Sequence, residues 1–570
     1  MADFSQAGSA SRPVSQRLTA GARSFVAAFA WIALVGIAGF ISIDSSATPA
    51  QATPAHAKLA PRLFETSHGC MACHNGLTTS SGEDVSIGSL WRASMMANSA
   101  RDPYWQASVR REVLDHPERR AEIEDACATC HMPMMRYQAR VDGGAGEVFA
   151  HLPIANGDKD AKALAADGVS CTLCHQMANQ QLGAPATFNG AFTVDELLPN
   201  GRRPIFGPYD IDDGRQRIMH SAAGYVPTRG DHIRASELCS SCHTLFTSIQ
   251  GPGGKQVARL PEQVPFLEWK HSSYSERSSC QSCHMPAVTE SIAIASVLGI
   301  TRNRLARHDF RGGNFFVLGM LKRYRSELGV TALPQELDAS VRRTMSSLEH
   351  ETARLTIDNA HTTGGRLEAT VVLRNLTGHK FPTAYPSRRA WLHVTVRDGA
   401  GAVVFESGAV GSDGSISGND NDADAARFEP HYQSISRNDQ VQIYESIMHD
   451  TAGRVTTGLL AAASYIKDNR LLPDGFEKRI ASNDIAVHGE AAVDADFLGG
   501  GDRVAYSIDV SRASGPFDLV AELRFQPVSF RWARNLSGRR AAEITRFIAY
   551  YDAMASASSV AVASAAARVP

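Results

Sequence analysis

Apolar and polar positions follow different patterns in successive parts of the chain. From residue 313 to 355, apolar residues recur every three or four positions around a break at Pro334, which predicts a helical connector. From residue 356 to 550, apolar and polar residues alternate over short stretches bounded by turn residues, which predicts an antiparallel, β-sandwich-like C-terminal domain. The strands predicted there cover residues 367–373, 391–396, 403–405, 440–444, 504–508 and 519–525.

The part of the chain before this connector has a weaker periodicity. Its helical signals are short and lie between Gly- and Pro-rich loops. Asp102 is a favourable N-cap for a helix that ends before Pro117, and a second short helix is expected from Glu118 into Cys127. Residues 58–312 are therefore predicted to be mainly α-helical and irregular, with little apolar core of their own.

The two ends of the chain differ from the rest. Residues 1–57 combine an Arg-bearing start, an apolar stretch from Phe25 to Ile43 and a linker rich in Ala, Pro and Thr, the pattern of an export signal. The apolar stretch of about 19 residues is long for a cleaved signal and just long enough to cross a bilayer, so we expect either a signal peptide or a retained N-terminal membrane anchor. Both predict a periplasmic or otherwise outward-facing protein. Residues 551–570 are rich in Ala and Ser and are predicted to form a disordered tail.

Composition excludes one class of function and draws attention to the cysteines. The 570 residues carry a formal net charge of −2, which argues against a nucleic-acid binder. Ten cysteines accompany twenty histidines, and every cysteine falls into a C-x-x-C-H pattern. The five copies are Cys70-Met71-Ala72-Cys73-His74, Cys127-Ala128-Thr129-Cys130-His131, Cys171-Thr172-Leu173-Cys174-His175, Cys239-Ser240-Ser241-Cys242-His243 and Cys280-Gln281-Ser282-Cys283-His284.

This pattern is the signature of covalent c-type haem attachment. Two thiols three positions apart bond to the two vinyl groups of one haem, and the adjacent His becomes the proximal ligand of the iron. A disulfide framework needs no His after every second cysteine, a zinc site pairs two C-x-x-C knuckles without that His, and a thioredoxin-like motif occurs once per domain. The sequence therefore predicts five covalent haems c, stacked as the core of residues 58–312. The predicted proximal ligands are His74, His131, His175, His243 and His284.

The contexts of the motifs resemble a known family. One set resembles multihaem cytochromes c with a cytochrome c-554-like domain: Trp91 to Ala97, Gly168 to Gln176, Glu268-Trp269 and Cys280 to Pro286. A second set resembles a bacterial pentahaem subfamily with a C-terminal β-domain: Gly378 to Pro382, Tyr385 to Trp391 and Lys467 to Arg470. The resemblance covers roughly residues 60–550. It implies close-packed haems, mostly with two His ligands each, that serve as an electron wire.

Five irons need up to five distal ligands, and several histidines are candidates. His116 stands at a helix end, His232 lies shortly before the fourth motif, and His308 precedes a Gly-Gly turn. His379 lies in a loop between predicted strands and could reach back onto a haem. These four are the candidate distal histidines.

Met96 departs from the family pattern. In the pattern W-x-x-S-x-H-A the His is commonly an iron ligand, and Met96 stands at the corresponding position. Three interpretations remain open: Met96 ligates an iron through its thioether, it packs beside an iron without a strong sixth ligand, or it packs while another His ligates. A thioether ligand would raise the potential of that haem.

Two features of the predicted β-domain have alternative interpretations. The Asp-rich loop at residues 420–424 could hold Ca²⁺, but His431 stands where the final Glu of such a loop is expected, so a solvated turn is favoured. His393 alternates with Trp391 on a predicted strand and is expected to be structural.

The favoured function is electron transfer outside the cytoplasm in a respiratory chain, between redox partner proteins whose identity the sequence leaves open. The alternative is a multihaem oxidoreductase of a small nitrogen or sulfur compound, acting at one haem with an open coordination position. All five motifs end in His, whereas nitrite reductases of the resembled superfamily usually replace one such His by Lys. A third interpretation is a scaffold whose β-domain binds a partner while the haems relay electrons.

Overall fold

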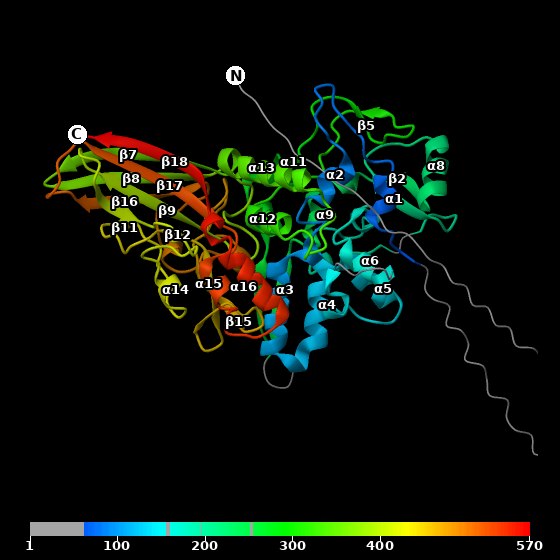
Figure 1. Cartoon of the computed structure of the whole chain (residues 1–570), viewed down its shortest axis with the longest axis horizontal. Helices are drawn as coiled ribbons and strands as arrows, with labels where there is room; N and C mark the ends of the chain where they lie inside the picture. The colour runs from blue at the N-terminus through cyan, green and yellow to red at the C-terminus, as the bar shows by residue number, and fades with distance from the viewer. Residues whose placement is uncertain (1–61, 155–159, 195–196, 251–254) are drawn as a thin grey trace, which may run out of the picture. The chain divides into compact units, whose positions relative to one another are not determined.

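Short helices dominate the first half of the chain in the computed structural model, which describes residues 62–154, 160–194, 197–250 and 255–570 (Figure 1). The export-signal prediction for residues 1–57 lies outside these residues. The helices before residue 313 are α1 (Ser67–Met71), α2 (Ile87–Arg92), α3 (Pro103–Asp115), α4 (Arg120–His131), α5 (Pro133–Val141), α6 (Asp160–Ala166), α7 (Cys171–Cys174), α8 (Asp213–Ala223), α9 (Ser236–Ser240), α10 (Pro265–Lys270) and α11 (Cys280–His284).

Local chemistry fixes the two helices that the sequence predicts here. The Asp102 carboxylate accepts hydrogen bonds from the backbone N–H groups of Tyr104 (2.8 Å) and Trp105 (3.2 Å), and α3 ends just before Pro117. α4 follows and ends with the second C-x-x-C-H motif. Both predicted helices are confirmed.

Three small sheets lie between the helices of the first half. β1 (Arg203–Gly207) pairs in parallel with β2 (Tyr225–Arg229), while β3 (Leu245–Gln250) pairs with β4 (Gln256–Gln263) and β5 (Ile292–Ala293) with β6 (Thr301–Arg302), both antiparallel. The segment predicted to be a helical connector contains α12 (Phe315–Arg323) and α13 (Pro334–Glu351). Met320 is fully buried between these elements, and Met345 packs against the same core.

Two larger sheets share a core in the second half. The first has the strand order β10 (Val403–Ser407), β9 (Arg389–Arg397), β17 (Phe517–Gln526) and β18 (Val560–Val569), with β12 (Ile443–Tyr444) also paired to β9. The second has the order β11 (Ser434–Ile435), β16 (Gly501–Asp509), β8 (Arg366–Asn375) and β7 (Ala353–Thr363). The predicted alternation is present in β8, where every second side chain from Leu367 to Leu373 is buried. The rings of Phe405 and Tyr506, one from each sheet, meet edge to face at 6.3 Å.

A smaller sheet and three helices complete this half. The sheet has the order β14 (Val455–Thr456), β13 (Ser446–Asp450) and β15 (Ala462–Asp468), and the helices are α14 (Asp420–Ala423), α15 (Phe530–Arg534) and α16 (Ala542–Asp552). Of the predicted strand at residues 440–444, only β12 forms. β11 pairs with β16 in parallel, so the second sheet is not purely antiparallel.

The predicted disordered tail is wrong. β18 pairs with β17 along its length and buries Val562 and Val569, and Figure 1 shows it running beside β17 and β7. The error has a physical cause, because small Ala and Ser side chains fit between close neighbouring strands without giving a strong apolar alternation, and tertiary context overrides their weak strand propensity.

The two halves are bound together within one compact unit from Leu59 to Pro570. Arg110 of α3 forms a bidentate ion pair with Glu543 of α16 (2.9 Å), and Arg539 forms one with Asp115 (2.7 Å). Among the described residues, none of the helices combines the length and apolar character that a membrane span requires.

Candidate haem-binding site

One large cavity collects the residues of all five motifs. It has a volume of about 1450 Å³, and all ten cysteines and all five motif histidines line it. Ligand pockets usually measure about 300–1,000 Å³, and protein interiors are otherwise close-packed. A lining of ten free thiols and seven imidazoles is the donor set that several covalent haems require. The residues of the cavity therefore fit the predicted prosthetic groups.

Each motif is carried on a turn of helix, which explains its spacing. The backbone N–H of His74, His175 and His243 donates to the carbonyl oxygen of the first cysteine of its own motif, at 3.0 Å in each case. This i to i+4 bond places the two thiols, three residues apart, on the same side of the turn. The adjacent imidazole is then presented next to both thiols.

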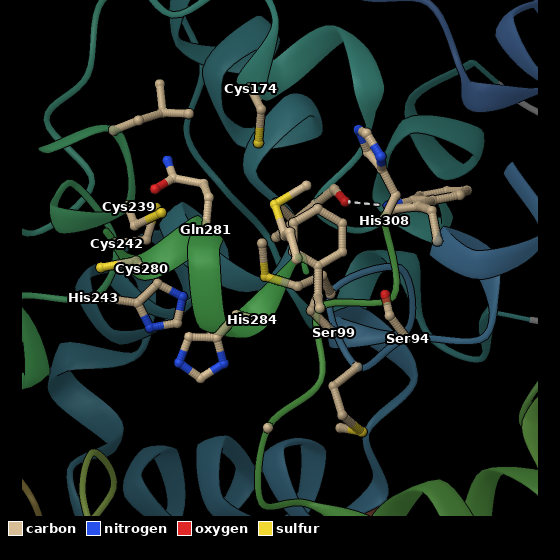
Figure 2. A pocket seen from close by; sticks show the side chains of 18 of the residues that line it. Ser94, Ser99, Cys174, Cys239, Cys242, His243, Cys280, Gln281, His284 and His308 are labelled. Carbon is tan, nitrogen blue, oxygen red and sulfur yellow. Dashed lines mark hydrogen bonds between the residues drawn. The ribbon is translucent and has the colours of Figure 1, made fainter. Parts of the chain in front are cut away.

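Thiols of different motifs touch one another across the cavity. Cys70 is within hydrogen-bond reach of Cys171, Cys130 of Cys242, and Cys239 of Cys280. Cys174 is also close enough to interact electrostatically with both thiols of the fourth motif. Figure 2 shows Cys239, Cys242 and Cys280 gathered together, with the rings of His243 and His284 beside them. These contacts connect the first motif to the third and the third to the fourth. The second and fifth motifs each contact the fourth.

Six imidazoles of the cavity are oriented by the same kind of hydrogen bond. In each ring Nδ1 lies within hydrogen-bond distance of a backbone carbonyl oxygen, so the network assigns the proton to Nδ1 and leaves Nε2 free. The pairs are His74 with Ile294 (2.6 Å), His131 with Ser99 (3.1 Å), His175 with Phe206 (2.6 Å), His284 with Arg311 (2.5 Å), His308 with Ala306 (2.9 Å) and His379 with Lys380 (2.9 Å). Metal-bound histidines are commonly held in this way.

The charge state of these rings also suits a metal ligand. Burial lowers the pKa of His131, His243, His308 and His379 to about 4. These four rings are therefore neutral near pH 7, the form in which imidazole binds a metal.

Two pairs of imidazoles have the separation of axial ligands on one iron. The ring centroids of His175 and His308 lie 6.3 Å apart with planes 15° from parallel, and those of His284 and His379 lie 6.3 Å apart at 14°. Two coaxial imidazoles on opposite sides of one metal ion place their centroids about 6 Å apart, since each metal–nitrogen bond is about 2 Å. His308 and His379, two of the four candidate distal histidines, therefore have the separation from a motif histidine that a second ligand of the same iron would need.

The other three motif histidines have no such partner among the described residues that line the cavity. His74, His131 and His243 remain after the two pairs are assigned. The Trp105 ring stacks on His131, with centroids 4.4 Å apart and planes 4° from parallel. A haem lies perpendicular to its axial imidazole, so this stack is compatible with iron ligation by His131.

The structure does not bring His116 and His232 to the cavity. His116 ends α3 and is half-buried outside the cavity lining. His232 is buried, but its Nε2 lies 2.9 Å from the carbonyl oxygen of Met177, so the nitrogen that would bind iron is already hydrogen-bonded. Both differ from the expectation for distal ligands, because sequence position gives no information about which ring faces the cavity.

Met96 lines the cavity and is half-buried. Its carbonyl oxygen accepts a hydrogen bond from Val169 N–H (3.0 Å), two residues before the third motif. The three interpretations of its thioether stay predictions.

A buried ionic network holds the loop that presents His379. The fully buried Glu268 carboxylate accepts hydrogen bonds from Lys380 N–H (3.1 Å) and Thr383 Oγ1 (2.5 Å), and lies 3.0 Å from Arg470. Asp468 joins the network through Lys380 Nζ (2.8 Å) and Arg470 (2.7 Å). The cations Arg470 and Lys380 keep the pKa of Asp468 far below its usual range despite the opposing effect of burial. The motif Glu268-Trp269 thus has a structural role that sequence reasoning did not assign.

A second group of polar side chains lines the cavity and was also missed. Asp102 and Tyr104 reach it from the start of α3, and Tyr385, Ser387 and Arg388 from the segment before β9. Burial raises the pKa of Asp102 to about 6 and lowers that of Arg388 to about 10. The sequence Tyr385 to Arg388 could have indicated this group. It was noted as part of the family resemblance, but no chemical role was assigned to it.

The Asp-rich loop is solvated only at its end, because Ala423 and Asp424 are exposed while the side chain of Asp422 is buried in an ion pair. Both carboxylate oxygens of Asp422 bind the guanidinium of Arg389 (2.8 and 2.9 Å), and its side chain is 4% exposed. Asp420 pairs with Arg427. Two of the three carboxylates that a calcium ion would need are therefore occupied by arginines. His393 lies between Glu406 (3.0 Å) and Glu522 (3.3 Å), as expected of a structural residue.

His431 forms a buried cluster with Asp494 and Asp502. The side-chain amides of Gln442 and Asn469 donate to its Nδ1 (2.9 and 3.1 Å), so Nε2 carries the proton and donates it to Asp494 (3.0 Å). Each ring nitrogen is satisfied, and the cluster is a hydrogen-bond network instead of a metal site.

No family model and no curated protein matches the chain. Among solved structures, the chain is similar to a penta-heme cytochrome c552 from Thermochromatium tepidum, with a TM-score of 0.48 and 16% sequence identity. The similarity covers 89% of this chain and 100% of that chain.

Proposed function

We propose that this chain is a pentahaem c-type cytochrome that carries electrons outside the cytoplasm, between redox partner proteins of a respiratory chain. The observation that carries the proposal is that all ten cysteines and all five adjacent histidines line one cavity. Each attached haem would supply a one-electron couple. The role of the chain is to fix the haems close together and to hold neutral imidazoles toward them.

The contacts between motifs support a branched relay. The thiols of the first and third motifs touch, as do those of the second and fourth and of the fourth and fifth. Haems bonded to touching thiols would lie edge to edge. The fourth motif, Cys239 to His243, is the branch point through which the second and fifth motifs would exchange electrons with the first and third.

Removal of this branch point tests the relay. In the double variant Cys239→Ser/Cys242→Ser, we expect four remaining haems that reduce in three separate groups, because the second and fifth motifs are joined to the others only through the fourth. The haems of the first and third motifs should reduce together, and those of the second and of the fifth each on their own. The measurement is stopped-flow reduction followed at the haem absorption bands, with the haem content of each variant checked by intact mass.

The matched control is Cys70→Ser/Cys73→Ser, which removes an end of the relay. Its four haems should still equilibrate as one connected group, as in the unaltered protein. Equally fast equilibration in both double variants would contradict the branched relay.

The alternative, an oxidoreductase of a small nitrogen or sulfur compound, has one specific observation in its favour. Three motif histidines, His74, His131 and His243, have no second imidazole among the described cavity residues. An iron with an open position is what such chemistry requires.

A further inference from the structure

An arginine faces the cavity without a carboxylate partner. The Arg388 guanidinium donates to the carbonyl oxygen of Thr383 (3.0 Å), and no carboxylate of the described residues lies within ion-pair distance of it. The acidic residue that interacts with it electrostatically is Asp102, and one carboxylate oxygen of Asp102 already accepts two backbone N–H groups at the start of α3. A buried guanidinium normally pairs with an anion. Arg388 therefore presents an unpaired positive charge to the cavity.

A hydroxyl donor without a partner lies in the same part of the cavity. Tyr104 is 7% exposed, and its hydroxyl makes no hydrogen bond with any described residue, although the hydroxyls of Ser108 and Ser387 lie near it. Its ring meets that of Tyr385 edge to face at 6.0 Å, which closes one wall. A buried hydroxyl without a partner costs free energy unless a ligand satisfies it.

These groups lie beside a motif histidine that has no imidazole partner. Arg388 is close enough to His243, His379 and Asp102 to interact electrostatically with each, and of the two histidines only His243 lacks an imidazole partner among the described residues. Burial raises the pKa of Asp102 to about 6, so its carboxylate opposes anion binding less as the pH falls toward 6 and its neutral form becomes populated.

We propose that Arg388 and Tyr104 form a binding site for a small anion at the open distal face of the haem that the fourth motif would hold. The guanidinium supplies the charge and the hydroxyl a hydrogen-bond donor, while the anion occupies the sixth position of that iron. The site goes beyond electron transfer and needs only the proposed haem attachment, which intact mass tests separately. Tyr385 and Ser387 complete the lining from the same segment as Arg388.

The test compares an anionic with a neutral iron ligand on the full haem-loaded chain. Azide should bind the oxidised protein and carbon monoxide the reduced protein, each changing the absorption spectrum of one haem. Arg388→Gln should weaken azide binding on the order of 10-fold or more, the range for a hydrogen bond to a charged group, and leave carbon monoxide binding unchanged. Arg388→Lys should retain part of the azide affinity.

A matched control comes from another arginine of the cavity. Arg136 also lines it but is already paired with Asp125 (3.0 Å), so Arg136→Gln should leave azide affinity within about twofold. Tyr104→Phe should weaken azide in the same direction as Arg388→Gln and provides a second variant if that protein does not fold.

Three outcomes would overturn the proposal. The unaltered protein could take up neither ligand, which would exclude an open iron. Azide affinity could be unchanged in both Arg388→Gln and Tyr104→Phe. Finally, Arg388→Gln could shift a haem midpoint potential with no effect on azide, which would assign the guanidinium to a haem propionate instead of a free anion.

Discussion

Replacing His379 by Ala is expected to convert one low-spin haem into a high-spin haem, and His308→Ala is expected to do the same to a different haem. Each ring lies 6.3 Å from a motif histidine in a near-parallel orientation, His379 opposite His284 and His308 opposite His175. Loss of either ring leaves one iron without its sixth ligand. Electron paramagnetic resonance of the oxidised protein measures the change, and the double variant should contain two new high-spin haems.

The controls are the two candidate histidines that lie away from the cavity. His116→Ala and His232→Ala should keep the spectrum of the unaltered protein, because neither ring lines the cavity. A high-spin signal from His232→Ala, together with an unchanged spectrum in His379→Ala, would reverse the assignment of distal ligands.

Glu268→Leu is expected to destabilise the protein strongly and to release His379 from its iron. Glu268 holds the loop of His379 through Lys380 N–H and Thr383 Oγ1 and neutralises Arg470 at 3.0 Å, all in a fully buried position. Breaking one partner out of a buried ionic network costs about 3–5 kcal/mol. The measurements are the midpoint of thermal unfolding and the high-spin fraction at a temperature well below it.

Two further variants distinguish the effect of disrupting the buried network from the effect of removing a carboxylate charge. Glu268→Gln keeps a polar side chain of the same shape but removes the negative charge. Its unfolding midpoint and its high-spin fraction should both lie between those of Glu268→Leu and those of the unaltered protein. Asp338→Asn removes the carboxylate of an exposed pair with Lys322 and should cost less than about 1 kcal/mol. A high-spin fraction in Glu268→Leu that does not rise above that of the unaltered protein would show that the network does not position His379.

Local chemistry made part of the fold predictable. The Asp102 cap defined the start of α3, and alternation from Leu367 to Leu373 defined β8, because each signal lies within a few residues of the element that it specifies. β18 could not be predicted in this way. Its small side chains gain their strand conformation from β17, which is adjacent in space but more than thirty residues earlier in the chain.

The candidate site was likewise predictable only in part. The ten cysteines and five adjacent histidines were predictable because covalent haem attachment requires two cysteines and a histidine at fixed places within five consecutive residues. The choice of His308 and His379 over His116 and His232 was not, since it depends on which ring the folded chain turns toward the cavity. The roles of Glu268 and Arg388 likewise arise only where segments more than a hundred residues apart meet.

We propose that five haems are bonded to the ten cysteines that line the cavity. The most direct measurement is the intact mass of the mature protein after acid–acetone extraction, which removes haem that is not covalently bound. We expect a mass that exceeds the mass of the polypeptide by five haems. A mass that corresponds to four haems or fewer would contradict it.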